Sequence, residues 1–145
     1  MINGMFDSGA MPALEKMAQF TGERNKLIAH NIANFSTPYY KPVDLDPRAF
    51  QKQLRDAIDQ RRGTTHPQRG KLELSATGPA KTSSDGKLTF TPTQNNENIL
   101  FHDQNNRDLE RTMQDLVENA LVHRASIDLM KNQFDMLEMA IRERV

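Results

Sequence analysis

Residues 107–143 read RDLERTMQDLVENALVHRASIDLMKNQFDMLEMAIRE, with neither proline nor glycine. Within this stretch, apolar and small residues recur at alternating steps of four and three positions. Such spacing, sustained over several heptads, predicts one long α-helix with a narrow apolar stripe, as in coiled coils. We call this stripe the C-terminal seam, and its members are Leu109, Met113, Leu116, Ala120, His123, Ile127, Met130, Phe134, Leu137 and Ile141.

Both ends of this predicted helix carry residues that helix termini favour. Asn105 or Asn106 is expected to cap its start, with Asp108 in the first turn and Arg142 in the last. At 1.5 Å per residue, the helix is about 50 Å long. A small globule has no place to bury a straight helix of that length, so we expect it to contact other helices.

A weaker form of the same spacing predicts a second long helix over residues 9–34. Thr21 and Asn25 make the middle of its stripe polar, which weakens packing but can fix register and partner choice. Gly22 costs about 1 kcal/mol relative to alanine, so we expect the helix to depend on a partner. The apolar positions of this N-terminal seam are Leu14, Ala18, Ile28 and Ile32.

The limits of the second helix are marked by capping residues and prolines. A cap at Ser8 or nearby and Pro12 in the first turn are expected to begin it. The helix is expected to end near Asn34, because Pro38 disfavours the α-helical conformation at Thr37 before it. The Asn34 side chain can satisfy a carbonyl of the last turn, or its backbone can take the left-handed cap conformation.

Between the two long helices, residues 35–106 are expected to hold one short helix. Asp46 is its predicted cap and Pro47 its first residue, and it runs to about Arg61. One face of this helix is apolar, which predicts that it packs on the rest of the domain. The residues of that face are Phe50, Leu54, Ala57 and Ile58.

From residue 63 to 106 the sequence is rich in Gly, Pro, Ser, Thr and Asn. Alternating runs at 72–76 and 87–91, with a Ser-Asp-Gly turn at 84–86, predict a small exposed hairpin or an extended loop. We therefore predict a single, mainly α domain over residues 1–145. Its two long terminal helices form an antiparallel coiled-coil-like pair, joined by a short helix and this extended segment.

The composition favours a subunit that completes its core with neighbouring chains. Hydrophobic residues make up 37% of the sequence and there is no tryptophan, which is lean for a small self-contained domain. Basic and acidic residues number 19 each, so the formal net charge is zero. This balance argues against nucleic-acid binding and favours association of like chains. No cysteine, cleavable signal peptide or membrane-length apolar run is readable.

No pattern of catalytic, cofactor-binding or metal-binding residues is found in the sequence. The four histidines lack the paired spacing of a zinc site, and neither a nucleophile elbow nor a phosphate-binding loop occurs. His123 lies on the C-terminal seam, where we expect it to pack or to form a hydrogen bond between helices. The sequence therefore predicts a protein that is not an enzyme and uses no cofactor, metal or small-molecule substrate.

One motif points to a specific family. Residues 27–41 read LIAHNIANFSTPYYK. They resemble the motif of the flagellar axial proteins, whose N-terminal helix ends in the pattern N-I-A-N-x-x-T-P-G-Y-K. Tyr39 stands where the family usually has glycine. If that position needs a positive φ, tyrosine would be strained, so we expect a different turn or an extended Tyr39. The matching residues are Asn31, Ile32, Ala33, Asn34, Thr37, Pro38, Tyr40 and Lys41.

The C-terminal half narrows the resemblance to the flagellar basal-body rod proteins. Residues 103–113, DQNNRDLERTM, followed by ENAL at 118–121, are similar to the proximal rod proteins of the FlgB type. Gln104, Arg107 and Val117 depart from that family's usual pattern. The resemblance covers both ends of the chain, and the middle segment is not diagnostic.

The resemblance implies a structural subunit of the flagellar rod, which transmits torque. Such proteins are exported by the flagellar type III apparatus without signal cleavage and assemble in the periplasm. Their partners are copies of themselves, other rod proteins, and membrane-ring, export-gate and junction components at the rod base. The alternative is a cytosolic helical adaptor or export chaperone that binds partner helices without polymerising. That alternative accounts for the seams but not for the motif at 31–41.

Overall fold

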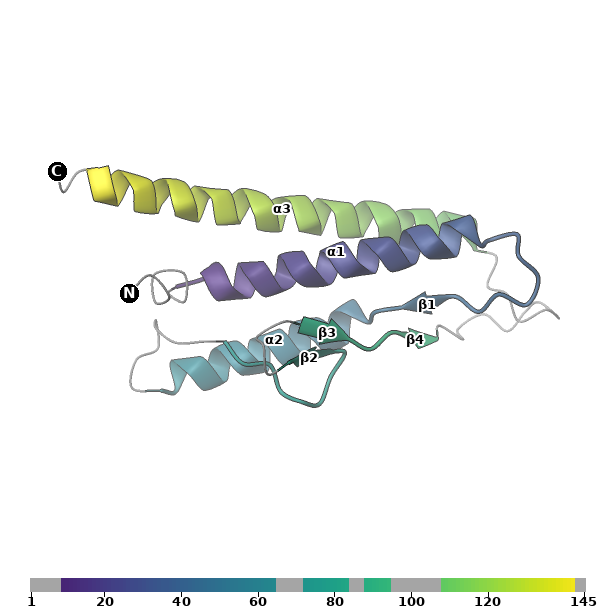
Figure 1. The fold of residues 1–145 in the computed structure, drawn as a ribbon, viewed down its shortest axis with the longest axis horizontal. Coiled ribbons are helices and arrows are strands. Elements are labelled where there is room, and N and C mark those ends of the chain that lie inside the picture. The colour runs from purple at the N-terminus through teal and green to yellow at the C-terminus, as the bar shows by residue number, and fades with distance from the viewer. Residues whose placement is uncertain (1–8, 65–71, 84–87, 95–107, 143–145) are drawn as a thin grey trace.

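The computed structural model describes residues 9–64, 72–83, 88–94 and 108–142, and it is mainly helical with a small β-hairpin region. Its helices are α1 (Met11–Ala33), α2 (Pro47–Arg62) and α3 (Leu109–Arg142). The strands are β1 (Val43–Asp44), β2 (Ala80–Thr82), β3 (Leu88–Phe90) and β4 (Thr93–Gln94). In Figure 1, α3 lies along α1, and α2 and the strands lie on the other side of α1.

The two long helices run in opposite directions. Thr21 of α1 contacts His123 and Asn119 of α3, whereas Arg24, further along α1, contacts Asp115, which comes earlier in α3. The order of contacts is therefore reversed between the helices. The C-terminal end of α3 extends past the described start of α1 (Figure 1).

The helix starts differ in how they are capped. The Oδ1 atom of Asp46 accepts hydrogen bonds from the backbone N–H groups of Arg48 and Ala49, as predicted for α2. The α3 cap is Asp108, whose Oδ1 atom accepts from the backbone N–H of Arg111 at 3.0 Å. We had expected Asp108 inside the first turn; the expected caps at 105 and 106 lie outside the described residues.

The start of α1 has Pro12 in its first turn, as predicted. Its N-cap residue is Ala10, which offers no side-chain hydrogen bond, and Ser8 lies outside the described residues. At the other end, Asn34 follows the last helical residue with φ −101°, so the expected left-handed cap is wrong. The Asn34 Nδ2 atom instead donates to the His30 carbonyl at 2.9 Å, which satisfies a carbonyl of the last turn.

The strands form two short antiparallel pairs. β2 pairs with β3, with Ala80 opposite Phe90, and β1 pairs with β4. Of the two predicted runs, the one at 72–76 forms no strand. The side chains of Leu72 and Leu74 both enter the core, where they are 3% and 7% exposed. This burial explains why apolar residues alternate with polar ones in the segment. The predicted turn at 84–86 lies outside the described residues.

The core lies between α1, α2 and the segment that follows α2. The rings of Phe20 and Phe50 stack with centroids 4.0 Å apart. The middle segment does contain a hairpin, β2 and β3, which includes part of the predicted run at 87–91, but the expectation that it is exposed is wrong, because Ala80 and Leu88 are buried in this core. No residue of α3 belongs to the buried cluster of the described chain, which comprises Phe20, Leu45, Phe50, Leu54, Ala57, Leu72, Leu74, Ala80 and Leu88. None of the helices described is long and apolar enough to span a bilayer.

Candidate assembly surface and the turn after α1

The C-terminal seam is split between two environments. Alternate members, Leu116, His123, Met130 and Leu137, are half-buried, and we call them the inner row. The members between them are exposed, at 47% for Met113, 46% for Ile127, 42% for Phe134 and 55% for Ile141. Leu109 is 44% exposed as well. We call the second set, completed by the exposed Ala120, the outer row: Met113, Ala120, Ile127, Phe134 and Ile141.

The side of α3 that meets α1 is largely polar. Asn119 and Ser126 are its buried residues, at 3% and 4% exposure, and Thr112 and Asp115 are half-buried. The Asn119 Nδ2 atom donates to the backbone carbonyl of Thr21 at 2.8 Å. The predicted apolar seam is thus rotated partly away from α1, and polar side chains occupy the contact.

A hydrogen bond between side chains continues this polar contact. The Thr21 hydroxyl donates to the Met17 carbonyl at 2.8 Å, and its Oγ1 atom lies 2.8 Å from Nδ1 of His123. Which of the two side chains donates in this bond depends on the tautomer of His123. His123 therefore serves as a hydrogen-bonded interhelical residue, as the sequence suggested.

A buried arginine joins α1, β1 and α3. The Arg24 side chain is 7% exposed and lies 2.8 Å from Asp44 and 3.4 Å from Asp115. Burial alone lowers the pKa of Arg24, but the hydrogen bonds and charges of Asp44 and then Asp115 outweigh it, so the net pKa is raised. These ion pairs fix the position of α3 along the axis of α1.

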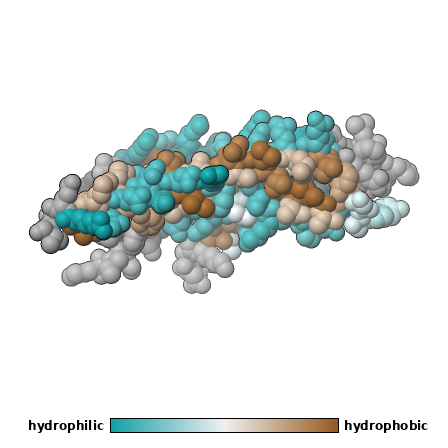
Figure 2. Space-filling view, turned by 90° about the horizontal axis from the view of Figure 1, so that it is seen from above, coloured by the Kyte–Doolittle hydropathy of each residue, from teal (hydrophilic) through white to brown (hydrophobic). Residues whose placement is uncertain are grey.

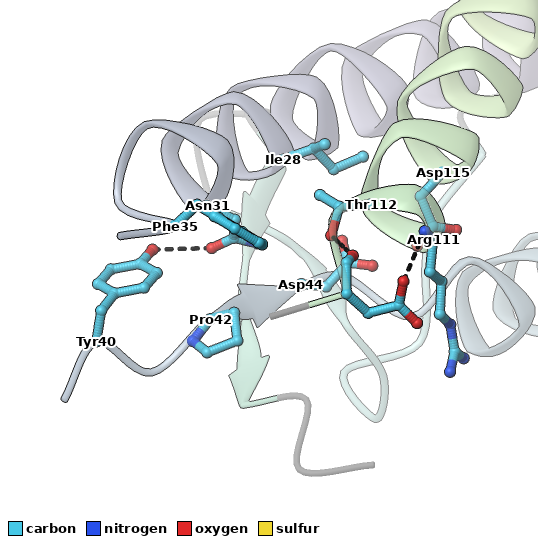
Figure 3. A pocket seen from close by; sticks show the side chains of 10 residues that line it. Ile28, Asn31, Phe35, Tyr40, Pro42, Asp44, Arg111, Thr112 and Asp115 are labelled. Atoms are coloured by element: carbon cyan, nitrogen blue, oxygen red, sulfur yellow. Dashed lines mark hydrogen bonds between the residues drawn. The ribbon is translucent and has the colours of Figure 1, made fainter. Parts of the chain in front are cut away.

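One member of the N-terminal seam, Ile28, lies next to α3. Ile28 is 2% exposed and lines, with Thr112 and Asp115, a small hollow of about 40 Å³ (Figure 3). Leu14, Ala18 and Ile32 are half-buried. Asn25 is exposed, so its expected place in the stripe is wrong; its part is taken by Arg24, one residue earlier.

The family motif builds the turn that leaves α1. The Asn31 Nδ2 atom donates to the Val43 carbonyl at 2.8 Å, and its Oδ1 atom accepts from the Tyr40 hydroxyl at 2.8 Å (Figure 3). The same Oδ1 atom lies 3.3 Å from the backbone N–H of Val43. Asn31 therefore fastens the last turn of α1 to the start of β1 through both ends of its amide.

Thr37, Pro38, Tyr39 and Tyr40 form a type II turn. The backbone N–H of Tyr40 donates to the Thr37 carbonyl at 3.3 Å, proline holds the second position, and Tyr39 in the third has φ +60°. Our expectation of an altered turn or an extended Tyr39 is therefore wrong. Tyrosine adopts the strained conformation that glycine would adopt freely, while its side chain is 81% exposed.

The remaining motif residues have plainer environments. Ile32 is half-buried, while Ala33 and Lys41 are exposed. His30 approaches the motif from α1, with its Nδ1 atom 2.9 Å from the Tyr40 hydroxyl.

Sequence reasoning missed the polar side of α3, although a signal for it was present. Thr112, Asn119, Ser126 and Gln133 recur every seven residues, each a small or amide side chain without charge. Such a row next to an apolar stripe is the pattern of a helix whose contact with a neighbour is hydrogen-bonded.

The described part of the chain contains no group of three or more side chains suited to hold a metal ion. His66 and His102 lie outside it. In the comparisons with known proteins, no protein-family model and no curated sequence matches this chain.

Proposed function

We propose that this chain is a structural subunit of the bacterial flagellar basal-body rod, in its proximal part. In this proposal it has no catalytic activity, is exported without signal cleavage and assembles in the periplasm. It polymerises with copies of itself and other rod proteins, and it meets the membrane-ring, export-gate and junction components at the rod base. Its role is to transmit torque.

The observation that supports self-assembly most strongly is the exposed outer row. Full burial of a large apolar side chain contributes roughly 1.5–3 kcal/mol, so covering a half-exposed one contributes about 1 kcal/mol. Met113, Ile127 and Ile141 are such residues, spaced along one side of α3. Together they supply a row of contacts that a neighbouring helix can bury.

Coiled-coil packing in the assembled state follows from the same seam. The inner row is half-buried, with His123 hydrogen-bonded to α1, and the outer row lies beside it on α3. A helix from a neighbouring subunit that packs on the outer row would complete the 3.5-residue repeat. We therefore propose that α1 and α3 form coiled coils with the helices of adjacent subunits.

The rod in particular is supported by the motif at 31–41. Asn31, Pro38 and Tyr40 each have a defined part in the turn after α1. The resemblance to the flagellar axial proteins thus rests on residues that shape the backbone. Tyr39 keeps the positive φ that the family glycine would supply.

The test is Ile127→Asp, introduced in place of the wild-type gene in the bacterium that encodes it. Because Ile127 is 46% exposed, the variant should keep its helical circular dichroism. It should nevertheless lose motility and fail to purify with basal bodies. The matched control is Asn132→Asp, which adds the same charge at an exposed position of α3 and should leave motility intact.

Full motility of Ile127→Asp would contradict the proposal. The wild-type protein also decides between a rod subunit and a cytosolic adaptor. A rod subunit should be found in isolated basal bodies, whereas an adaptor should stay in the cytosolic fraction.

A further inference from the structure

The outer row lies on the side of α3 that faces away from the core. Val122, on the opposite side of α3, lines a hollow of about 250 Å³ together with Phe20 and Phe50. Met113 is nine positions before Val122, which places the two on opposite sides of the helix. Figure 2 views the molecule from above α3 and shows apolar patches bordered by hydrophilic side chains. A second chain can therefore reach the outer row without meeting α2 or the strands.

Charged residues follow the outer edge of this row. Arg124 is paired with Asp128 at 3.9 Å, and Glu138 is paired with Arg142 at 3.3 Å.

The other two charges on that edge are Glu110 and Lys131, both exposed. Neither forms a hydrogen bond or ion pair with any residue in the described ranges. They carry opposite charges and are separated by 21 positions, which is three heptads. This separation places them on the same edge of α3.

We propose that two copies of this chain pair antiparallel along the first three members of the outer row, Met113, Ala120 and Ile127, with Ala120 at the two-fold axis. Glu110 of each copy then faces Lys131 of the other. Met113 faces Ile127 of the other copy, because residue numbers at facing positions sum to about 240. Ala120 faces itself, and its small side chain lets the helices approach closely where they cross.

The charge pattern favours this arrangement over a parallel pair and over antiparallel pairs shifted by one or two heptads toward the C-terminus. In an in-register parallel pair, each residue faces the same residue of the other copy, so Glu110 does not face Lys131. In antiparallel pairs shifted by one or two heptads toward the C-terminus, Arg124 approaches itself or Lys131, and like charges repel. The net charge of zero leaves no overall repulsion between two copies.

This pairing goes beyond the proposed function, because a rod could be built from helices without it. The pairing is tested on the purified chain, whereas the rod function is tested in isolated basal bodies. A monomeric chain in solution would therefore overturn the pairing and leave the rod subunit standing.

The experiment is a charge exchange measured by sedimentation velocity over a concentration series. The wild-type chain should form a dimer. Glu110→Lys and Lys131→Glu should each weaken it about tenfold, because each replaces two attractive contacts with two repulsive ones. The double variant should restore wild-type affinity, since the exchanged charges still face each other.

Asp56→Lys on α2 is the matched control, because Asp56 is exposed and far along the chain from α3. It should leave the dimer unchanged. Circular dichroism should show that all variants keep the wild-type helical content. The proposal is overturned by a wild-type chain that stays monomeric, or by a double variant that is no better than the single ones.

Discussion

The hydroxyl of Thr21 on α1 and Nδ1 of His123 on α3 lie 2.8 Å apart, and this bond marks the middle of a polar contact between the two helices. Polar pairs between helices fix register at some cost in stability. Here they also fix the rotation of α3 about its axis. The hydrogen-bonded side turns toward α1, and the outer row is left exposed.

The Asn119–Thr21 hydrogen bond should contribute measurably to the docking of α3. Asn119→Ala removes a buried donor and should lower the free energy of unfolding by about 1–2 kcal/mol, measured by urea denaturation. The matched control is Gln114→Ala, whose side chain contacts Glu118 at the surface of the same helix. It should change stability by less than about 0.5 kcal/mol. Equal effects of the two variants would mean that the polar contact adds nothing.

Tyr39→Gly should stabilise the chain. A left-handed non-glycine residue costs about 1–2 kcal/mol, and the added flexibility of glycine in the unfolded chain offsets about half of that. The expected gain in the free energy of unfolding is therefore about 0.5–1 kcal/mol. Tyr39→Ala is the control, because it removes the ring but keeps the Cβ atom and the strain. If the alanine variant gained as much free energy of unfolding as the glycine variant, the ring and not the backbone would be responsible.

The Tyr40 hydroxyl should ionise only above its ordinary range. Burial raises the pKa of Tyr40 above 10, because the phenolate loses solvation. The folded state then holds this proton more tightly than the unfolded state. Tyr40 therefore contributes stability that is complete below pH 10 and is lost as the pH rises further.

The chain has two tyrosines, so a Tyr39→Gly variant leaves Tyr40 as the only phenol. Absorbance at the phenolate band, followed against pH, should give a midpoint above 10 in the folded variant. Denaturant should return the midpoint to the ordinary value. A folded midpoint at or below 10 would show that the site does not shield the hydroxyl.

Gly78 leaves room for the buried carboxamide of Gln53. A Cβ atom at residue 78 would lie 2.6 Å from that carboxamide. The Gln53 Nε2 atom donates to the carbonyls of Ser75 and Ala80, so it cannot move without breaking these bonds. Gly78→Ala should cost about 1–3 kcal/mol in the free energy of unfolding.

Gln53→Ala removes both the donor and the obstacle, but the φ of +158° at residue 78 still strains an alanine there. The Gly78→Ala/Gln53→Ala double variant should therefore lose less stability than the sum of the two single variants, a non-additive result. Additive losses would mean that the two residues act independently.

The helices could be predicted because their signals are local. The 3.5-residue repeat of α3 and the Asp46-Pro47 start of α2 each depend on neighbours in the sequence. The arrangement of the middle segment could not be predicted in the same way. Leu72 and Leu74 alternate like a strand, but whether they pair with another strand depends on residues far away in the chain.

The sequence predicted which residues form the C-terminal seam, but it did not predict which edge of the seam faces α1. Periodicity identifies a stripe, but it does not say which edge meets α1. That was decided by Arg24, Asp44 and Asp115, which come from three elements and form ion pairs only in the folded chain. The conformation of Tyr39 was also beyond prediction, because the surrounding turn imposes a φ that tyrosine rarely adopts.

The central claim is that other subunits cover the outer row of α3 in the assembled rod. The chain contains no cysteine, so Ile127→Cys provides a single thiol in that row. Its reaction with a maleimide should be fast in the purified chain diluted until it is monomeric, slow in isolated basal bodies, and fast again after the basal bodies are dissociated and diluted. A thiol that reacts equally fast in intact basal bodies, or a chain that is absent from them, would contradict the account.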